Sequence, residues 1–255
     1  MAIEIEQFTC RSDNFGVLVH DPGSGETASI DAPEADPILK ALERRGWRLT
    51  HLLITHHHAD HTDGIDALKA LGGVEVIGPE REAARVRGLD RTVRGGDALH
   101  LCGDRVAVID VPGHTAGQIA FHFEGAGRVF TADSLFSLGC GRVFEGTMEE
   151  MHRSLQRLAA LPPDTLVHCG HEYTASNAAF ALTVDPGNAA LQERADAVRR
   201  MRERGEATLP VRLGDELATN PFLRPHDPAI RDALGMAEAS DAAVFAALRR
   251  RKDAS

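Results

Sequence analysis

The chain has 255 residues, of which 43% are hydrophobic, and its formal net charge at pH 7 is -10. This length and apolar content suffice for a substantial core, in one large domain or in one domain with a smaller companion. The negative charge disfavours nucleic acid and anionic membranes as partners.

The start of the chain and its cysteines indicate a cytoplasmic protein. The first residues, MAIEIEQFTC, lack the basic and apolar regions of a signal peptide, and no apolar stretch approaches the ~20 residues of a membrane span. No two cysteines form a C-x-x-C pair, which favours reduced thiols at Cys10, Cys102, Cys140 and Cys169. We expect a monomer or weak homo-oligomer without membrane or nucleic-acid partners.

Short apolar runs alternate with helical patterns over the first two-thirds of the chain. The runs predict strands at Val17–His20, Ala28–Ile30, His51–Thr55, Val74–Ile77, Val106–Val111, Ile119–Phe123, Val129–Thr131 and Leu166–His168. Helical spacing predicts helices at Ala35–Arg45, Ile65–Leu71 and Thr147–Leu158. The first of these should end at Gly46, and the last should begin with a capping box formed by Thr147 and Glu150.

After Tyr173 the pattern changes, and no further strand is predicted. Helices are expected at Ala175–Leu182, Ala189–Arg204 and Asp241–Lys252, joined by segments rich in Pro and Gly. We therefore predict an α/β domain over residues 1–173 and a small helical domain over residues 174–255.

Histidines and aspartates gather where apolar runs of the first domain end. Leu52–Thr55 is followed by His56, His58, Asp60 and His61 in an H-x-H-x-D-H string. Three other runs lead to His114, Asp133 and His171. Ligands at the ends of separate strands can meet at one edge of a sheet, so the pattern predicts a metal site.

The number of candidate ligands predicts two metal ions. A catalytic zinc needs only three protein ligands and a water, and seven ligands are too many for one ion. We assign His56, His58 and His114 to one metal, and Asp60, His61 and His171 to the other. Asp133 would bridge the pair, and a water or hydroxide would take the remaining bridging position. The other eight histidines are expected to be ordinary loop or core residues.

These motifs resemble the metallo-β-lactamase superfamily, and within it the chain is similar to glyoxalase II, the hydroxyacylglutathione hydrolases. The resemblance rests on His56–His61, Gly113–Thr115, Asp133 and Cys169–Tyr173 for the superfamily, and on Gly139–Gly146, Asn220–Arg224 and Leu248–Asp253 for the branch. It implies an αββα sandwich with a small C-terminal helical domain. It also implies two divalent metal ions, with zinc the usual metal and iron or manganese tolerated.

The resemblance further implies hydrolysis of S-D-lactoylglutathione to D-lactate and glutathione, as part of methylglyoxal detoxification. The residues carried over as glutathione contacts are Arg142, Tyr173, Arg249 and Lys252, with Phe144 lining the site. Two positions depart from some members of the family. Arg142 stands where they have Lys, which changes the donor geometry, and Phe144 stands where they have Tyr, which removes a hydroxyl.

In the implied mechanism a metal-bound hydroxide, oriented by Asp60, attacks the thioester carbonyl. The thiolate that leaves has a parent pKa of ~8.5 and needs little help from an acid. Cys140 and Cys169 therefore have no required catalytic part. Two alternatives stay open: a mononuclear-iron persulfide dioxygenase of the same superfamily, and a non-catalytic, metal-stabilised binding module.

Overall fold

The computed structural model describes residues 3–255, which divide into two compact units. The first unit comprises the chain up to Asp110 together with Ala116–Phe130. The second comprises Val111–Thr115 and Thr131–Ser255. Within the described residues, no helix has both the length and the apolar character that crossing a membrane requires.

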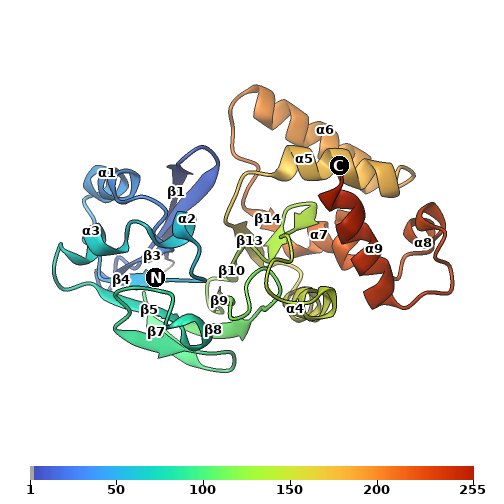
Figure 1. Ribbon diagram of the computed structural model, residues 1–255. Coiled ribbons are helices and arrows are strands. Elements are labelled where there is room, and N and C mark those ends of the chain that lie inside the picture. Colours follow the sequence, from blue (N-terminus) through green and yellow to red (C-terminus); the bar gives the residue numbers. More distant parts are fainter. Residues whose placement is uncertain (1–2) are drawn as a thin grey trace. The chain divides into compact units, whose positions relative to one another are not determined.

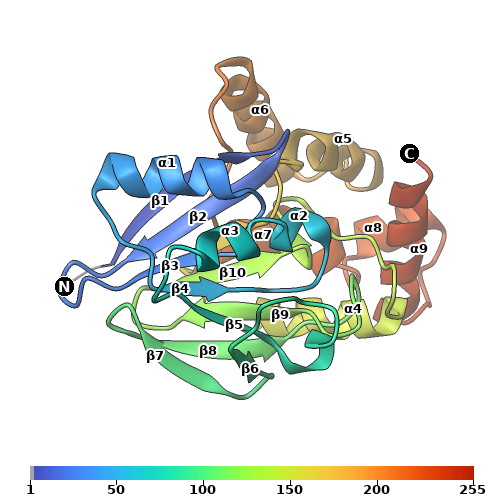
Figure 2. The same cartoon turned by 60° about the vertical axis from the view of Figure 1, so that its left-hand side comes forward.

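The main sheet of the first unit has six strands in sequence order (Figure 2): β1 (Glu4–Cys10), β2 (Asn14–His20), β3 (Thr27–Ile30), β4 (His51–Leu53), β5 (Glu75–Pro79) and β6 (Arg91–Val93). The first three pair antiparallel, and β3 to β6 pair parallel. In the register of β3 and β4, Ile30 lies opposite Leu53. The ends of these two strands, where Asp31 and Ile54 follow, are therefore neighbours.

Two helices cover this sheet, α1 (Ala35–Arg45) and α3 (Ile65–Lys69). Their apolar faces, including Ile38, Leu42 and Leu68, pack with Leu18 and Leu52 of the strands. Burial of these side chains is the main force that holds the layers together. A short helix, α2 (Ala59–Thr62), and a 3-10 turn, η1 (Glu80–Glu82), lie in the connections.

The rest of the first unit is an antiparallel array of β7 (Ala98–Leu101), β8 (Asp104–Asp110), β9 (Ile119–Phe123) and the start of β10 (Arg128–Ala132). Phe121, Phe123 and Phe130 are fully buried here, and the rings of Phe123 and Phe130 meet edge to face with centroids 5.4 Å apart. This contact fixes the position of β10, whose last residues lead to Asp133.

The second unit is mainly helical (Figure 1). Its strands are short, and its elements are β11 (Leu135–Phe136), β12 (Gly139–Cys140), α4 (Met148–Ala159), β13 (Leu166–Cys169), α5 (Thr174–Val184), α6 (Ala189–Glu203), β14 (Val211–Arg212), α7 (Leu213–Thr219), η2 (Pro221–Leu223), α8 (Pro228–Leu234) and α9 (Asp241–Asp253). The helices α5 and α6 pack side by side, with Ala178, Ala181 and Leu191 in their shared core.

The predicted helix boundaries are largely confirmed. The helix α1 ends at Gly46, whose φ of 67° is the left-handed conformation that favours glycine. Thr147 and Glu150 form the expected capping box at the start of α4. The predicted helix Ile65–Leu71 is two residues too long: α3 ends at Lys69, and Leu71, which is 52% exposed, lies outside it.

The strand prediction was wrong after Tyr173, and earlier in the chain it missed β1, β6, β7, β11 and β12. The strand β14 follows Tyr173, where no strand was predicted; it is only two residues long and exists because it pairs with β13. The strand β1 was missed because its sequence, EIEQFTC, contains no apolar run. Only its last residue, Cys10, is buried. The proposed division at residue 173 differs from the two compact units and stays a prediction.

Candidate metal centre

The H-x-H-x-D-H string lies in the first unit, where β4 ends and α2 begins. His56 and His61 are buried, whereas Asp60 is partly exposed. Nε2 of His56 lies 3.1 Å from Nδ1 of His58, so the two rings direct nitrogens toward a common point. Nε2 of His61 lies 3.7 Å from Oδ2 of Asp60.

Asp31 orients two of these histidines. Its Oδ2 lies 2.7 Å from Nδ1 of His61 and accepts the hydroxyl proton of Thr55 at 2.8 Å. The Thr55 oxygen, in turn, lies 3.0 Å from Nδ1 of His56. This bonding assigns the ring protons to Nδ1, so that Nε2 of His56 and His61 carries the lone pair that a metal needs.

Asp60 is held by Asn14, a buried residue at the start of β2. The Nδ2 atom of Asn14 donates to the backbone oxygen of Asp60 at 3.1 Å and to its Oδ2 at 3.2 Å. These bonds fix the carboxylate beside the imidazoles instead of leaving it in a free rotamer.

The other three predicted ligands come together in the second unit. Oδ2 of Asp133 lies 3.4 Å from Nε2 of His114 and 3.3 Å from Nε2 of His171. All three side chains are nearly inaccessible to solvent. One carboxylate between two imidazoles is the arrangement that a bridging ligand requires.

The surrounding backbone keeps His114 and Asp133 in place. Nδ1 of His114 bonds the Arg142 carbonyl oxygen at 2.9 Å, which directs Nε2 toward Asp133. A Cβ on Gly141 would lie 1.8 Å from the carbonyl oxygen of Asp133, so only glycine fits there. The close approach of the Asp133 backbone therefore explains why the segment after β12 has a glycine at position 141.

The donor set fits divalent cations. Imidazole nitrogens and carboxylate oxygens are ligands of zinc, iron and manganese, and the second nitrogens of His56, His61 and His114 are bonded as metal-binding histidines usually are. Within the first unit, Asp31, His56 and His61 place one potential ligand atom each within 4.8 Å of one another. The predicted grouping into two metals draws on both units and stays a prediction.

Two exposed aromatic side chains lie on the histidines of the second unit. The ring of Tyr173 stacks on His171, with centroids 4.7 Å apart, and Phe144 lies 5.2 Å from His114. Phe144 is 61% and Tyr173 38% exposed, so both rings are accessible to a ligand. Both were predicted to line a substrate site.

The predicted basic residues of α9 differ in environment. Arg249 is buried and donates to the Cys140 carbonyl oxygen at 2.6 Å, whereas Arg250 and Arg251 are exposed. Nζ of Lys252 donates to the backbone oxygen and to Oγ of Ser176, at 3.1 Å and 3.0 Å. Burial, together with Arg249 and Arg142, lowers the pKa of Lys252. The side chain of Arg142 is exposed.

A network missed by the sequence analysis supports the β11–β12 hairpin. Glu216 of α7 is fully buried and accepts bonds from Oγ of Ser137 and from the backbone nitrogen of Leu138, each at 2.7 Å. Asn220 donates to Glu216 at 2.9 Å and to the carbonyl oxygen of Gly139 at 3.0 Å. Burial raises the pKa of Glu216. The only signal for Asn220 was its place in a recognised motif.

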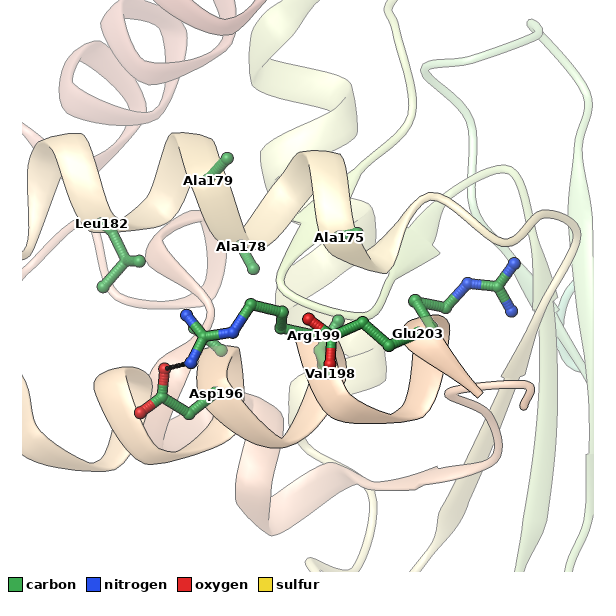
Figure 3. A pocket seen from close by; sticks show the side chains of 10 residues that line it. Ala175, Ala178, Ala179, Leu182, Asp196, Val198, Arg199 and Glu203 are labelled. Atoms are coloured by element: carbon green, nitrogen blue, oxygen red, sulfur yellow. Dashed lines mark ion pairs between the residues drawn. The ribbon is translucent and has the colours of Figure 1, made fainter. Parts of the chain in front are cut away.

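Two cavities lie on the helices of the second unit. One, of about 510 Å³ between α5 and α6 (Figure 3), has an ion pair of Asp196 and Arg199 and is lined by Ala175, Ala178, Ala179, Leu182, Ala195, Asp196, Val198, Arg199, Arg202 and Glu203. It contains no predicted site residue. The other, of about 480 Å³, has Lys252, Phe180 and Ser176 in its wall. This second cavity adjoins a predicted substrate contact.

Known protein families match nearly the whole chain, including the residues described above. A family model described as Metallo-beta-lactamase superfamily matches residues 12–171, and one described as Hydroxyacylglutathione hydrolase C-terminus matches residues 172–255. A hydroxyacylglutathione hydrolase of Mesorhizobium japonicum is 57% identical over 253 residues, 99% of each chain. One of Brucella anthropi is 57% identical over 98% of this chain and 96% of its own.

Solved structures resemble this one in fold. The BLEG-1 B3 metallo-beta-lactamase has a TM-score of 0.66 at 18% identity, covering 87% of this chain and 100% of its own. ETHE1 from Myxococcus xanthus has a TM-score of 0.61 at 27% identity, covering 86% of this chain and 98% of its own.

Proposed function

Because the chain belongs to the hydroxyacylglutathione hydrolase family of the metallo-beta-lactamase superfamily, we propose that it hydrolyses S-D-lactoylglutathione to D-lactate and glutathione. The predicted α/β fold with a C-terminal helical region is confirmed by the same matches. The single observation that carries the proposal is the 57% identity over nearly the full length of relatives with this name. The dioxygenase alternative is not favoured.

The metal ligands predicted from the sequence are proposed to bind two divalent ions. Two divalent ions, zinc in our proposal with iron or manganese as alternatives, would be held by His56, His58, Asp60, His61, His114, Asp133 and His171. When bound, such ions polarise a carbonyl oxygen and lower the pKa of a coordinated water toward ~7. The proposal is supported by the position of Asp133 between two Nε2 atoms and by the oriented tautomers of His56 and His61.

The protein's own residues would bind and orient the thioester. Phe144 and Tyr173 present aromatic faces beside the metal-ligand histidines, and can pack against the apolar parts of glutathione. Arg142, Arg249 and Lys252 supply positive charge for its carboxylates. Asp60, held by Asn14, can accept a hydrogen bond from the attacking water. The departing thiolate needs little help from an acid.

The test combines activity and metal analysis on the same purified sample. We expect hydrolysis of S-D-lactoylglutathione, measured as thiol release with a thiol reagent. We also expect about two transition-metal ions per chain. Asp133→Ala should lose both metals and the activity, whereas the control His100→Ala, at an exposed histidine, should lose neither. Full activity with one tightly bound metal would refute the two-metal assignment, and oxygen uptake with a persulfide would favour the dioxygenase.

We also propose a cytoplasmic location and a monomeric or weakly associating state. Light scattering over a range of protein concentrations would test the second point. A constant dimer mass at the lowest concentration would contradict it.

A further inference from the structure

In the second unit, the carboxylate of Asp253 already contacts two basic side chains, those of Arg249 and Arg142. Oδ1 of Asp253, the last residue of α9, lies 3.1 Å from Nε and 3.0 Å from an Nη atom of Arg249. The same oxygen lies 3.8 Å from Nε of Arg142. Asp253 is 35% exposed in its side chain, so solvent and ligands can reach it.

The contacts of Arg249 show that Asp253 is not its only support. The guanidinium donates to the Cys140 carbonyl oxygen at 2.6 Å and lies over the ring of Phe222, 5.2 Å from its centroid. Its side chain is only 4% exposed. Packing and this backbone bond therefore contribute to the position of Arg249 alongside the ion pair.

The position of Asp253 is unfavourable for stability of the helix. The C-terminal end of a helix carries partial negative charge, which repels a carboxylate. The ion pair with Arg249, four residues earlier, offsets this only in part, because the carboxylate is 35% exposed and an acid that follows its basic partner along a helix is the less favourable order. A carboxylate at this place is therefore better explained by an effect on what the basic residues bind than by stabilisation of α9.

We propose that Asp253 sets the substrate affinity of the enzyme by competing with the carboxylates of glutathione for Arg142 and Arg249. The inference rests on the proposed function, because it requires an anionic substrate at these arginines. The substrate carboxylate must share or displace Oδ1 of Asp253. Binding is thereby weakened, and release of the anionic product glutathione is favoured.

Two substitutions separate charge from geometry. Asp253→Asn removes the charge but keeps an amide oxygen that can accept the bond from Nε of Arg249, whereas Asp253→Ala removes both. Asp241→Asn, at the opposite end of α9, changes the net charge equally and serves as the control. The Michaelis constant for S-D-lactoylglutathione, kcat and the inhibition constant of glutathione are measured for each.

If Asp253 competes with the substrate, Asp253→Asn and Asp253→Ala each lower KM and the glutathione inhibition constant about two- to five-fold, the range of a pair in which solvent screens the carboxylate, with kcat unchanged. Added salt should then raise KM more steeply in these variants than in the wild type. Asp241→Asn should leave KM unchanged.

The outcomes separate the inference from the function on which it rests. An unchanged or raised KM in Asp253→Asn would overturn the inference alone, and a KM raised only in Asp253→Ala would show that Asp253 orients Arg249. If the wild type does not hydrolyse S-D-lactoylglutathione, the proposed function fails, and the inference fails with it.

Discussion

Oδ2 of Asp31 lies 2.7 Å from Nδ1 of His61, thirty residues further along the chain. Asp31 has a φ of 56°, and its other carboxylate oxygen accepts the backbone N–H of Thr55 at 2.7 Å. The carboxylate thus connects the end of β3 to the loop that carries the metal ligands. It belongs to the site although it is not among the predicted ligands.

Asp31→Asn should weaken metal binding about 10- to 100-fold, the usual loss when the carboxylate behind a metal-binding histidine is removed. An amide NH2 facing Nδ1 of His61 would disturb the tautomer that the metal needs. Metal affinity is measured by competition with a chelator. Asp66→Asn, at an exposed carboxylate of α3, is the control, and equal affinities for both variants would refute this role.

Cys140→Ser and Cys169→Ser should each keep kcat within about tenfold of the wild type, because neither thiol can act as the nucleophile. Burial raises the pKa of Cys140 to about 11, and that of Cys169 still further, so both thiols are protonated at neutral pH. Single-turnover kinetics and metal content are measured together. Loss of several orders of magnitude with the metal retained would indicate a covalent mechanism.

Arg249→Ala combined with Lys252→Ala should raise KM about 10- to 100-fold and change kcat little, because contacts far from the scissile bond are made equally in ground and transition states. Arg250→Ala with Arg251→Ala, on the exposed face, is the matched control.

The thermal midpoint must be measured alongside, since Arg249 also supports the hairpin through the Cys140 carbonyl. An unchanged KM in a folded Arg249/Lys252 variant would contradict the assignment of these residues to the substrate.

His152 should make the protein less stable below neutral pH. Its ring, between α4 and α9, stacks on Phe245, and burial lowers its pKa against the opposing effects of Asp241 and Glu149. The folded state therefore favours neutral His152. Its contribution to stability is present above the unfolded value of ~6.5 and is lost as the pH falls through that value toward the lower folded pKa.

Urea unfolding of the wild type and of His152→Gln between pH 5 and pH 7.5 checks this. The difference in unfolding free energy should change by at most about 1.4 kcal/mol per pH unit. Since the metal ligands titrate in both proteins, the difference isolates His152. Parallel pH profiles would show that folding does not lower the pKa of His152.

Much of the local structure follows from the sequence by itself. The end of α1 at Gly46 and the capping box of Thr147 depend on the conformational preferences of a few adjacent residues. The H-x-H-x-D-H spacing also has a local meaning, because it predicts ligands wherever the loop lies. Likewise, helical periodicity alone separates buried Arg249 from exposed Arg250 and Arg251.

The partners of these residues are decided by the tertiary structure. Asp31 meets His61 because β3 and β4 pair in parallel, Glu216 meets Leu138 across 78 residues, and Asp253 meets Arg142 because α9 ends beside the segment after β12. No periodicity in the sequence encodes such pairs, since each depends on how whole elements pack. The sequence thus determined which groups can bind metal and substrate, and the packing of the chain decided which groups orient and oppose them.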